Sequence, residues 1–230
     1  MRPLSLPAAA LLLLGCTATF RMPIVPPGLR PIPAADVRSW AASTAPPAWL
    51  FLRFSFRVRD EDGGSHGGRG SVFYAPPDSI HLDFRGSFGM GSGAAVVVGD
   101  SALWAEPKDQ VARVVPSYHL LWAMVGVARP PGPDWTTASQ VDAKANTVLY
   151  TRGSDTVLYT SMRTGQPRLV TYVVEGGKPI GRVWADFDQF RHLTTSKLVS
   201  LSSLVQVDIS FEVTKQLRID KDAWHAPSDH

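Results

Sequence analysis

Apolar and polar side chains alternate strictly along two long segments that lie far apart in the chain. Residues 50–58 carry Leu, Leu, Phe, Phe and Val at every second position, with Phe51, two arginines and a serine between them. Residues 205–213 repeat this pattern with Val, Val, Ile, Phe and Val. A period of two places alternate side chains on opposite faces of an extended strand. We therefore expect two strands, each with one buried and one mostly solvent-exposed face.

Further short segments of strand-like composition lie between these two and are separated by turn-forming residues. The expected strands are residues 70–74, 79–85, 94–98, 102–105, 146–152, 156–163, 168–175 and 179–187. Residues 60–68 are expected to form a loop, and Gly99-Asp100 a tight hairpin turn. About ten strands joined mostly by short turns predict a mainly β fold. We expect a single antiparallel meander that curls into an incomplete, half-open β-barrel.

Two segments have helical character. Residues 34–45 contain no proline, carry Asp36 near their start and stop before Pro46, and Val37, Trp40 and Ala41 share one helical face. Residues 118–128 are apolar almost all round and end before a pair of prolines. A helix that is apolar on every side is normally buried, so this second helix is expected inside the domain.

The N-terminus has the features of an export signal. Arg2 precedes an apolar stretch at residues 4–14 that is too short to span a bilayer, and Gly15 and Cys16 follow it. The string Leu-Leu-Gly-Cys resembles the lipobox of bacterial lipoproteins. That resemblance implies a signal peptide at residues 1–15 and lipid attachment to Cys16. Because Thr17 rather than aspartate follows the cysteine, sorting to the outer membrane is expected by analogy with proteobacteria.

Residues 16–33 are rich in proline, which fixes φ and removes amide donors. We expect this segment to be an extended tether between the lipid and a single domain at residues 34–230.

Several kinds of chemistry have no support in the sequence. Cys16 is the only cysteine, so an internal disulfide and CxxC metal or redox motifs are excluded. The six histidines lack metal-ligand spacing, and neither His-Glu-x-x-His nor Ser-x-x-Lys occurs. The net charge of +3 comes without a run of like charges, which argues against a nucleic-acid partner. We expect no catalytic residue, no metal and no cofactor, and a function that depends on shape and apolar surface.

Two further stretches have recognisable patterns. Residues 82–89, Leu-Asp-Phe-Arg-Gly-Ser-Phe-Gly, match a strand followed by a protruding loop with an apolar residue before glycine. Residues 120–126, closed by Pro130, are similar to a Leu-x-x-Trp-x-x-x-Gly helix with a proline exit. These stretches resemble the LolA/LolB-like lipoprotein carriers and receptors, and the LolB-type outer-membrane receptor in particular. The resemblance implies an open half-barrel whose concave side is covered by helices and receives acyl chains.

The expected cavity lining consists of apolar residues from the alternating strands and the internal helix. These candidates are Leu52, Phe54, Phe56, Leu82, Phe84, Leu121, Trp122, Val125, Ile209 and Phe211. The alternative is that they form an ordinary dry core. By resemblance, Phe88 and the nearby Met90 belong to a loop that helps to insert clients into the membrane. The alternative is that this loop folds back onto the domain.

The implied function is that of a lipid-anchored receptor on the periplasmic face of the outer membrane. Its partners would be lipid or acylated lipoprotein clients and a soluble periplasmic carrier, and we expect a monomer. The alternative is a structural or assembly lipoprotein that docks onto an outer-membrane protein complex without a lipid ligand.

Overall fold

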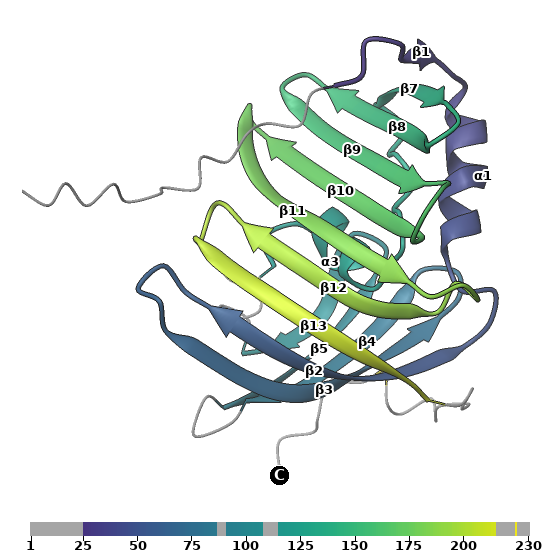
Figure 1. Ribbon diagram of the computed structural model, residues 1–230. Coiled ribbons are helices and arrows are strands. Elements are labelled where there is room, and N and C mark those ends of the chain that lie inside the picture. The colour runs from purple at the N-terminus through teal and green to yellow at the C-terminus, as the bar shows by residue number, and fades with distance from the viewer. Residues whose placement is uncertain (1–24, 87–90, 108–114, 215–223, 225–230) are drawn as a thin grey trace, which may run out of the picture.

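The computed structural model describes residues 25–86, 91–107, 115–214 and 224. In this part of the chain thirteen strands form one antiparallel sheet, which curls strongly without pairing its two outer strands (Figure 1). The described residues also contain two helices, α1 and α3. The predicted class, a mainly β fold built on an open antiparallel sheet, is confirmed.

The first half of the chain supplies one edge strand, a helix and a five-stranded meander. Its elements are β1 (Arg30–Pro31), α1 (Ala34–Thr44), β2 (Leu50–Arg59), β3 (Ser65–Ala75), β4 (Ser79–Gly86), β5 (Ser92–Val98) and β6 (Ser101–Glu106). The second half supplies a short helix and a seven-stranded meander. Its elements are α3 (Tyr118–Met124), β7 (Thr136–Val141), β8 (Ala145–Arg152), β9 (Asp155–Met162), β10 (Arg168–Glu175), β11 (Lys178–Phe187), β12 (Leu193–Ser200) and β13 (Val205–Thr214).

The strand order is β1-β7-β8-β9-β10-β11-β12-β13-β2-β3-β4-β5-β6. The strand order refines the prediction of a single meander of about ten strands in two respects. The described residues form thirteen strands, and β13 pairs with β2 and joins two meanders at the middle of the sheet. The two strictly alternating segments are these neighbours, with Phe54 opposite Phe211 and Phe56 opposite Ile209. Pairing of this kind depends on residues distant in sequence, which turn signals do not reveal.

Two predicted boundaries need correction. The strand expected at residues 70–74 begins at Ser65, because the turn before it is short: Gly63 has a φ of +80° and the Gly64 amide donates to Asp60 Oδ1 at 2.6 Å. The helix expected at residues 118–128 ends at Met124. Gly126 has a φ of +80° and its amide donates to the Ala123 carbonyl, which ends the helix before the prolines.

Strands β7 and β12 were missing from the prediction because neither carries a continuous apolar face. The segment of β7 reads Thr-Thr-Ala-Ser-Gln-Val, and on β12 the buried Leu198 lies between the buried Ser196 and Ser200. Ser200 pairs with Gly181 of β11, and a Cβ added to Gly181 would lie 2.9 Å from Leu120 Cδ1 of α3. The helix thus approaches the backbone of β11 at this point, where a side chain larger than that of glycine would collide with Leu120.

The N-terminal helix agrees with its prediction, since α1 covers residues 34–44 and buries Val37 and Ala41. Residues 30–31 of the segment predicted as a tether belong to the sheet, because β1 pairs with β7 and places Pro31 opposite Ala138. The Ile32 amide also donates to the Thr137 carbonyl at 3.1 Å. Proline is tolerated here because β1 lies at the edge of the sheet.

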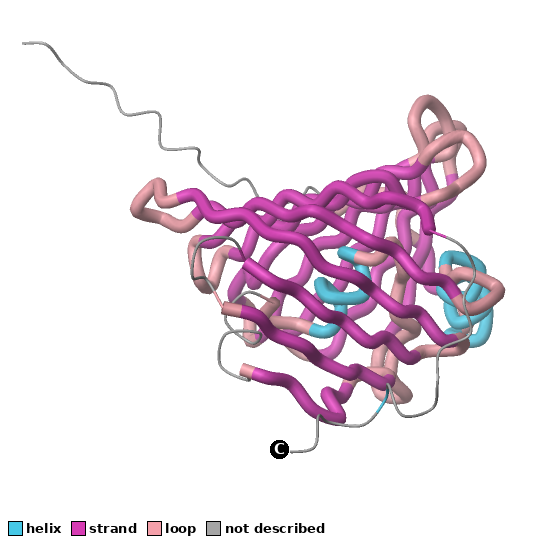
Figure 2. The backbone as a smooth tube through the Cα atoms, turned by 90° about the horizontal axis from the view of Figure 1, so that it is seen from below, coloured by secondary structure: helices cyan, strands magenta, loops and turns pink. Residues whose placement is uncertain are grey.

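Helix α3 lies inside the curve of the sheet, and α1 lies at one end of it (Figure 2). Leu120, Trp122 and Ala123 of α3 are completely buried, as are Tyr150 and Tyr159 of the facing strands. This part of the concave side is a packed core. The remaining part, over β2, β3, β4 and β13, is where the candidate site lies.

Candidate functional site

An apolar cavity of about 180 Å³ lies between α3 and the inner faces of β2, β3, β4 and β13. Its lining residues are Phe54, Phe56, Val58, Val72, Leu82, Phe84, Gly86, Val115, Leu121, Met124, Val125, Val207, Ile209 and Phe211. None of these carries a charged or hydrogen-bonding side chain. An apolar cavity of this kind excludes water and accepts hydrocarbon.

The floor of the cavity consists of phenylalanine rings that lie across glycines of the neighbouring strands. A Cβ added to Gly68 or Gly70 of β3 would collide with the ring of Phe56 or Phe54, and one added to Gly93 of β5 with the ring of Phe84. Because these glycines have no side chain, the rings lie along the sheet instead of projecting into the interior. The space above them therefore stays open.

The floor rings contact one another as a continuous aromatic surface. The ring centroids of Phe54 and Phe211 are 5.9 Å apart, those of Phe54 and Phe56 are 6.1 Å apart, and those of Phe56 and Phe84 are 6.3 Å apart. These separations are typical of tilted and edge-to-face aromatic pairs, which contribute about 0.5–1.5 kcal/mol each beyond area burial. The floor is consequently held in place without filling the cavity.

The roof is formed by Leu121, Met124 and Val125, on the side of α3 that faces the cavity. The opposite side of the helix is anchored to the core. Trp122 Nε1 donates to the Gly99 carbonyl at 2.8 Å, and His119 Nδ1 lies 3.0 Å from the Tyr159 hydroxyl. The roof is thus attached to the turn between β5 and β6 and to β9.

Eight of the ten residues predicted to line a cavity do surround this one: Phe54, Phe56, Leu82, Phe84, Leu121, Val125, Ile209 and Phe211. Leu52 and Trp122 do not. Leu52 lies one pleat further along β2, against a second cavity, and Trp122 is completely buried on the anchored side of α3. Contact of the eight residues with a ligand stays a prediction.

Six lining residues were missing from the predicted set. Val58 and Val207 belong to the same alternating segments as the predicted residues and could have been found by extending that pattern. Met124 lies three residues after Leu121, a spacing that places both on one helical face. Val72 required knowledge of the β2–β3 register, and no sequence signal pointed to Val115 or Gly86.

Cys16, Phe88 and Met90 lie outside the described residues. The structure does place Gly86 in the cavity lining, at the end of β4 where the segment that contains Phe88 and Met90 begins. Their roles stay predictions.

The cavity is accessible from outside the domain. Phe56, Val58, Leu82, Phe84 and Phe211 are only half-buried although all are apolar. Val115 and Val125 on the opposite wall are also half-buried. An incompletely covered apolar surface of this kind is a candidate site for apolar ligands.

The perturbed titratable groups of the interior lie on the far side of α3. Burial lowers the pKa of His119 to about 4, while Asp100 acts in the opposite direction. Burial, and next the charge of Asp78, raise the pKa of Tyr74 to about 12. Neither residue lines the cavity, and no described lining residue carries an acidic or basic side chain.

Residues 63–67, Gly-Gly-Ser-His-Gly, have the Gly-x-Ser-x-Gly spacing of a nucleophile elbow, so the expectation that this motif is absent from the sequence was wrong. Ser65 opens β3 directly after a hairpin turn and is exposed. A nucleophile elbow connects a strand to a helix. The spacing therefore does not mark a catalytic serine here.

Within the described ranges no group of three or more His, Cys, Asp or Glu side chains is placed to hold a metal ion. Neither α1 nor α3 has the length and apolar character needed to cross a membrane.

No family model and no curated protein matches the chain. The structure of a LolA superfamily protein from Nitrosomonas europaea superposes with a TM-score of 0.55 at 10% sequence identity, over 85% of this chain and 98% of that one. The fold is LolA-like. A putative outer membrane lipoprotein-sorting protein domain from Vibrio parahaemolyticus gives a TM-score of 0.36 at 7% identity, over 83% of this chain and 94% of that one. The LolA-like fold assignment rests on the first of these two structures.

Proposed function

We propose that the chain is a lipid-anchored envelope protein that holds acyl chains in the cavity beneath α3. The observation that carries the proposal is the cavity itself, whose 14 lining residues include no charged or hydrogen-bonding side chain although eight of them remain half-buried. An apolar cavity of about 150 Å³ is enough to stay dry and to bind benzene. A cavity of about 180 Å³ can therefore hold a segment of hydrocarbon chain.

The anchor is proposed to be Cys16, with residues 1–15 removed as a signal peptide and an N-terminal tether that ends where β1 joins the sheet. Two or more acyl chains give stable membrane attachment, at roughly 0.8 kcal/mol for each buried methylene. The outer membrane, on its periplasmic face, is the proposed location. The cavity is thereby kept close to the lipid from which, or to which, a ligand moves.

Within this proposal the protein acts as a LolB-type receptor. It accepts acylated lipoproteins or lipids from a soluble carrier and releases them into the membrane, with Phe88 and Met90 assisting the release. The LolA-like fold and the similarity of residues 82–89 and 120–126 to that receptor family support this role. Transfer requires no covalent step, because it depends only on where the acyl chain buries more apolar surface.

The test compares two tryptophan substitutions. Leu121→Trp places a larger side chain in the cavity, whereas Leu103→Trp adds the same group to a side chain of β6 that is 63% exposed. Titration of the mature domain with a fluorescent fatty acid should show saturable binding that Leu121→Trp weakens at least tenfold and Leu103→Trp leaves unchanged. A native domain that carries no co-purified lipid and binds no fatty acid would contradict the proposal.

A further inference from the structure

A second cavity, of about 610 Å³, lies at the α1 end of the interior. It is bounded by the C-terminal end of α1, the start of β2 and the turn that joins β11 to β12. Val125, the residue directly after α3, lines both this cavity and the apolar one, and Leu52 here is two residues from Phe54 there. The two cavities are therefore adjacent, and the side chain of Val125 stands between them.

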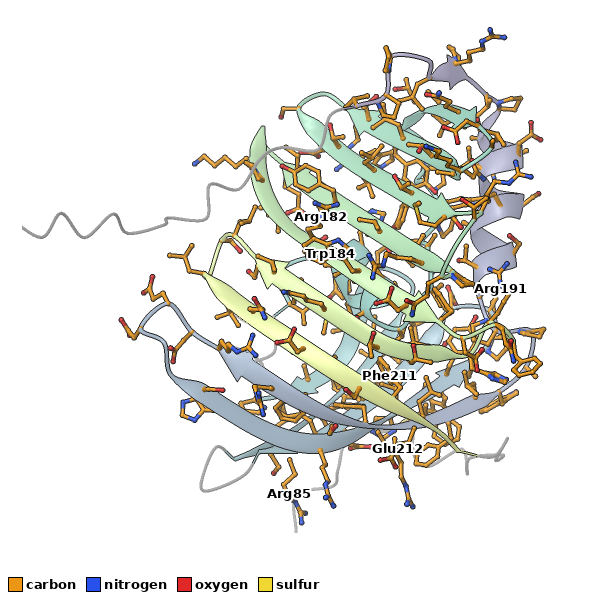
Figure 3. All side chains as sticks on the ribbon, in the orientation of Figure 1. Arg85, Arg182, Trp184, Arg191, Phe211 and Glu212 are labelled. Carbon is orange, nitrogen blue, oxygen red and sulfur yellow. The ribbon has the colours of Figure 1, made fainter. Side chains whose placement is uncertain are left out.

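The second cavity differs from the first in its polarity. Arg191 and His192 are the titratable side chains among its lining residues, which include no carboxylate. Arg191 lies beside the lower end of α1 (Figure 3). Its side chain is exposed and has no hydrogen bond or ion pair to any described residue. An unpaired cation thus stands at the mouth of an otherwise mostly apolar space.

The turn that carries Arg191 is built to hold it in an unusual conformation. Arg191 has a φ of +65°, a region that side chains other than glycine seldom adopt. Asp188 stabilises the turn: its Oδ1 accepts the amides of Phe190 and His192 at 2.8 Å each, and its Oδ2 lies 3.0 Å from His192 Nδ1. The Asp188 carboxylate is thereby engaged within the turn, whereas the Arg191 guanidinium has no partner among the described residues. Strained residues of this kind gather at ligand-binding sites.

Exposed aromatic side chains surround the same mouth. Phe190 at the tip of the turn is 71% exposed, and Trp49 before β2 is 39% exposed. Aromatic rings beside an arginine are suited to the boundary between lipid tails and lipid head groups. This end of the interior is therefore matched to an amphiphile rather than to a plain hydrocarbon.

We propose that the second cavity binds the anionic head group of an amphiphile whose acyl chain passes Val125 into the apolar cavity, and that Arg191 is the cation that selects it. The inference rests on the proposed acyl-binding function and narrows its ligand class to anionic lipids. Arginine suits this role because its planar guanidinium pairs with two oxygens of a carboxylate or phosphate at once.

The test uses two probes with the same chain and fluorophore, a fatty acid and the corresponding fatty alcohol, at pH 8. The native domain should bind the fatty acid about tenfold more tightly, as expected for one partly exposed charge-assisted hydrogen-bond pair. Arg191→Gln should remove the preference while keeping affinity for the alcohol. Arg38→Gln makes the same change of net charge on the exposed side of α1 and should keep the preference.

Three other outcomes of this binding test would overturn the head-group site or the function on which it rests. Equal binding of the two probes by the native domain would overturn the head-group site and leave the acyl cavity standing. A preference that survives Arg191→Gln would overturn the role of Arg191. Absence of binding for both probes would overturn the acyl-binding function together with this inference.

Discussion

The two parts of the concave face are filled differently. Over β10–β12 the space inside the sheet is filled by α3, whose Leu120 and Trp122 are completely buried. Over β2–β4 and β13 an apolar cavity of about 180 Å³ remains. Alternation of apolar residues therefore determines which face of a strand turns inward, but not whether the space in front of that face is filled.

Glycine has opposite consequences in the two parts. On β11, Gly181 lets Leu120 of α3 approach the backbone, so the helix lies close to the sheet. On β3, Gly68 and Gly70 are covered by phenylalanine rings from β2. These rings take the place that the helix takes over Gly181. A glycine covered by the helix goes with a packed interior. A glycine covered by a phenylalanine ring of the same sheet goes with a hollow one.

Neighbouring leucines of α3 provide a matched test of this comparison. Leu120→Ala should lower the free energy of unfolding by about 4 kcal/mol, since it leaves a new void in a packed region. Leu121→Ala should cost only about 2 kcal/mol, because its side chain borders space that is already empty. Denaturant titration of both variants measures the difference. Equal losses would mean that the two parts are packed alike.

The second prediction concerns pH and the packed part alone. The pKa of His119 falls from 6.5 to about 4 on folding, chiefly through burial, with Asp100 raising and Arg129 lowering it. Between these values the unfolded chain binds the extra proton, so stability is complete above pH 6.5 and decreases as the pH falls toward 4. The loss should amount to about 3 kcal/mol.

The control for this prediction is His119→Gln, which cannot take up the proton. Unfolding free energies measured from pH 7 to pH 4 should decrease less steeply for this variant than for the native domain. The same pH dependence in both would show that His119 is not the buried group responsible.

The parts of the fold that were predictable from sequence depend on local signals. Alternation located β2 and β13, proline bounded α1, and Gly99-Asp100 marked a hairpin. The signals failed where the alternation is broken or the pairing is long-range. On β12 the buried Leu198 lies between the buried Ser196 and Ser200, so residues 193–200 lack the continuous apolar alternation that marks β2 and β13. The β13–β2 pairing, which splits the meander, is a long-range contact.

The candidate site was predictable to a similar degree. Phe54, Phe56 and Phe84 were identified from alternation, but the glycines beneath their rings, which keep the cavity open, lie on other strands and become relevant only once the register is known. Trp122 was placed in the lining because the helix is apolar all round. Its anchored side and its cavity side have the same composition, so the sequence of α3 does not separate them.

The central claim is that the hollow part of the sheet, and not the packed part, receives an acyl chain. A crystal of the mature domain with a fatty acid brominated near its methyl end tests it most directly, because the bromine position can be read from anomalous scattering. We expect a bromine peak among Phe54, Phe211 and Leu121. A peak on the outer face of the sheet, or a cavity that stays empty at saturating fatty acid, would contradict it.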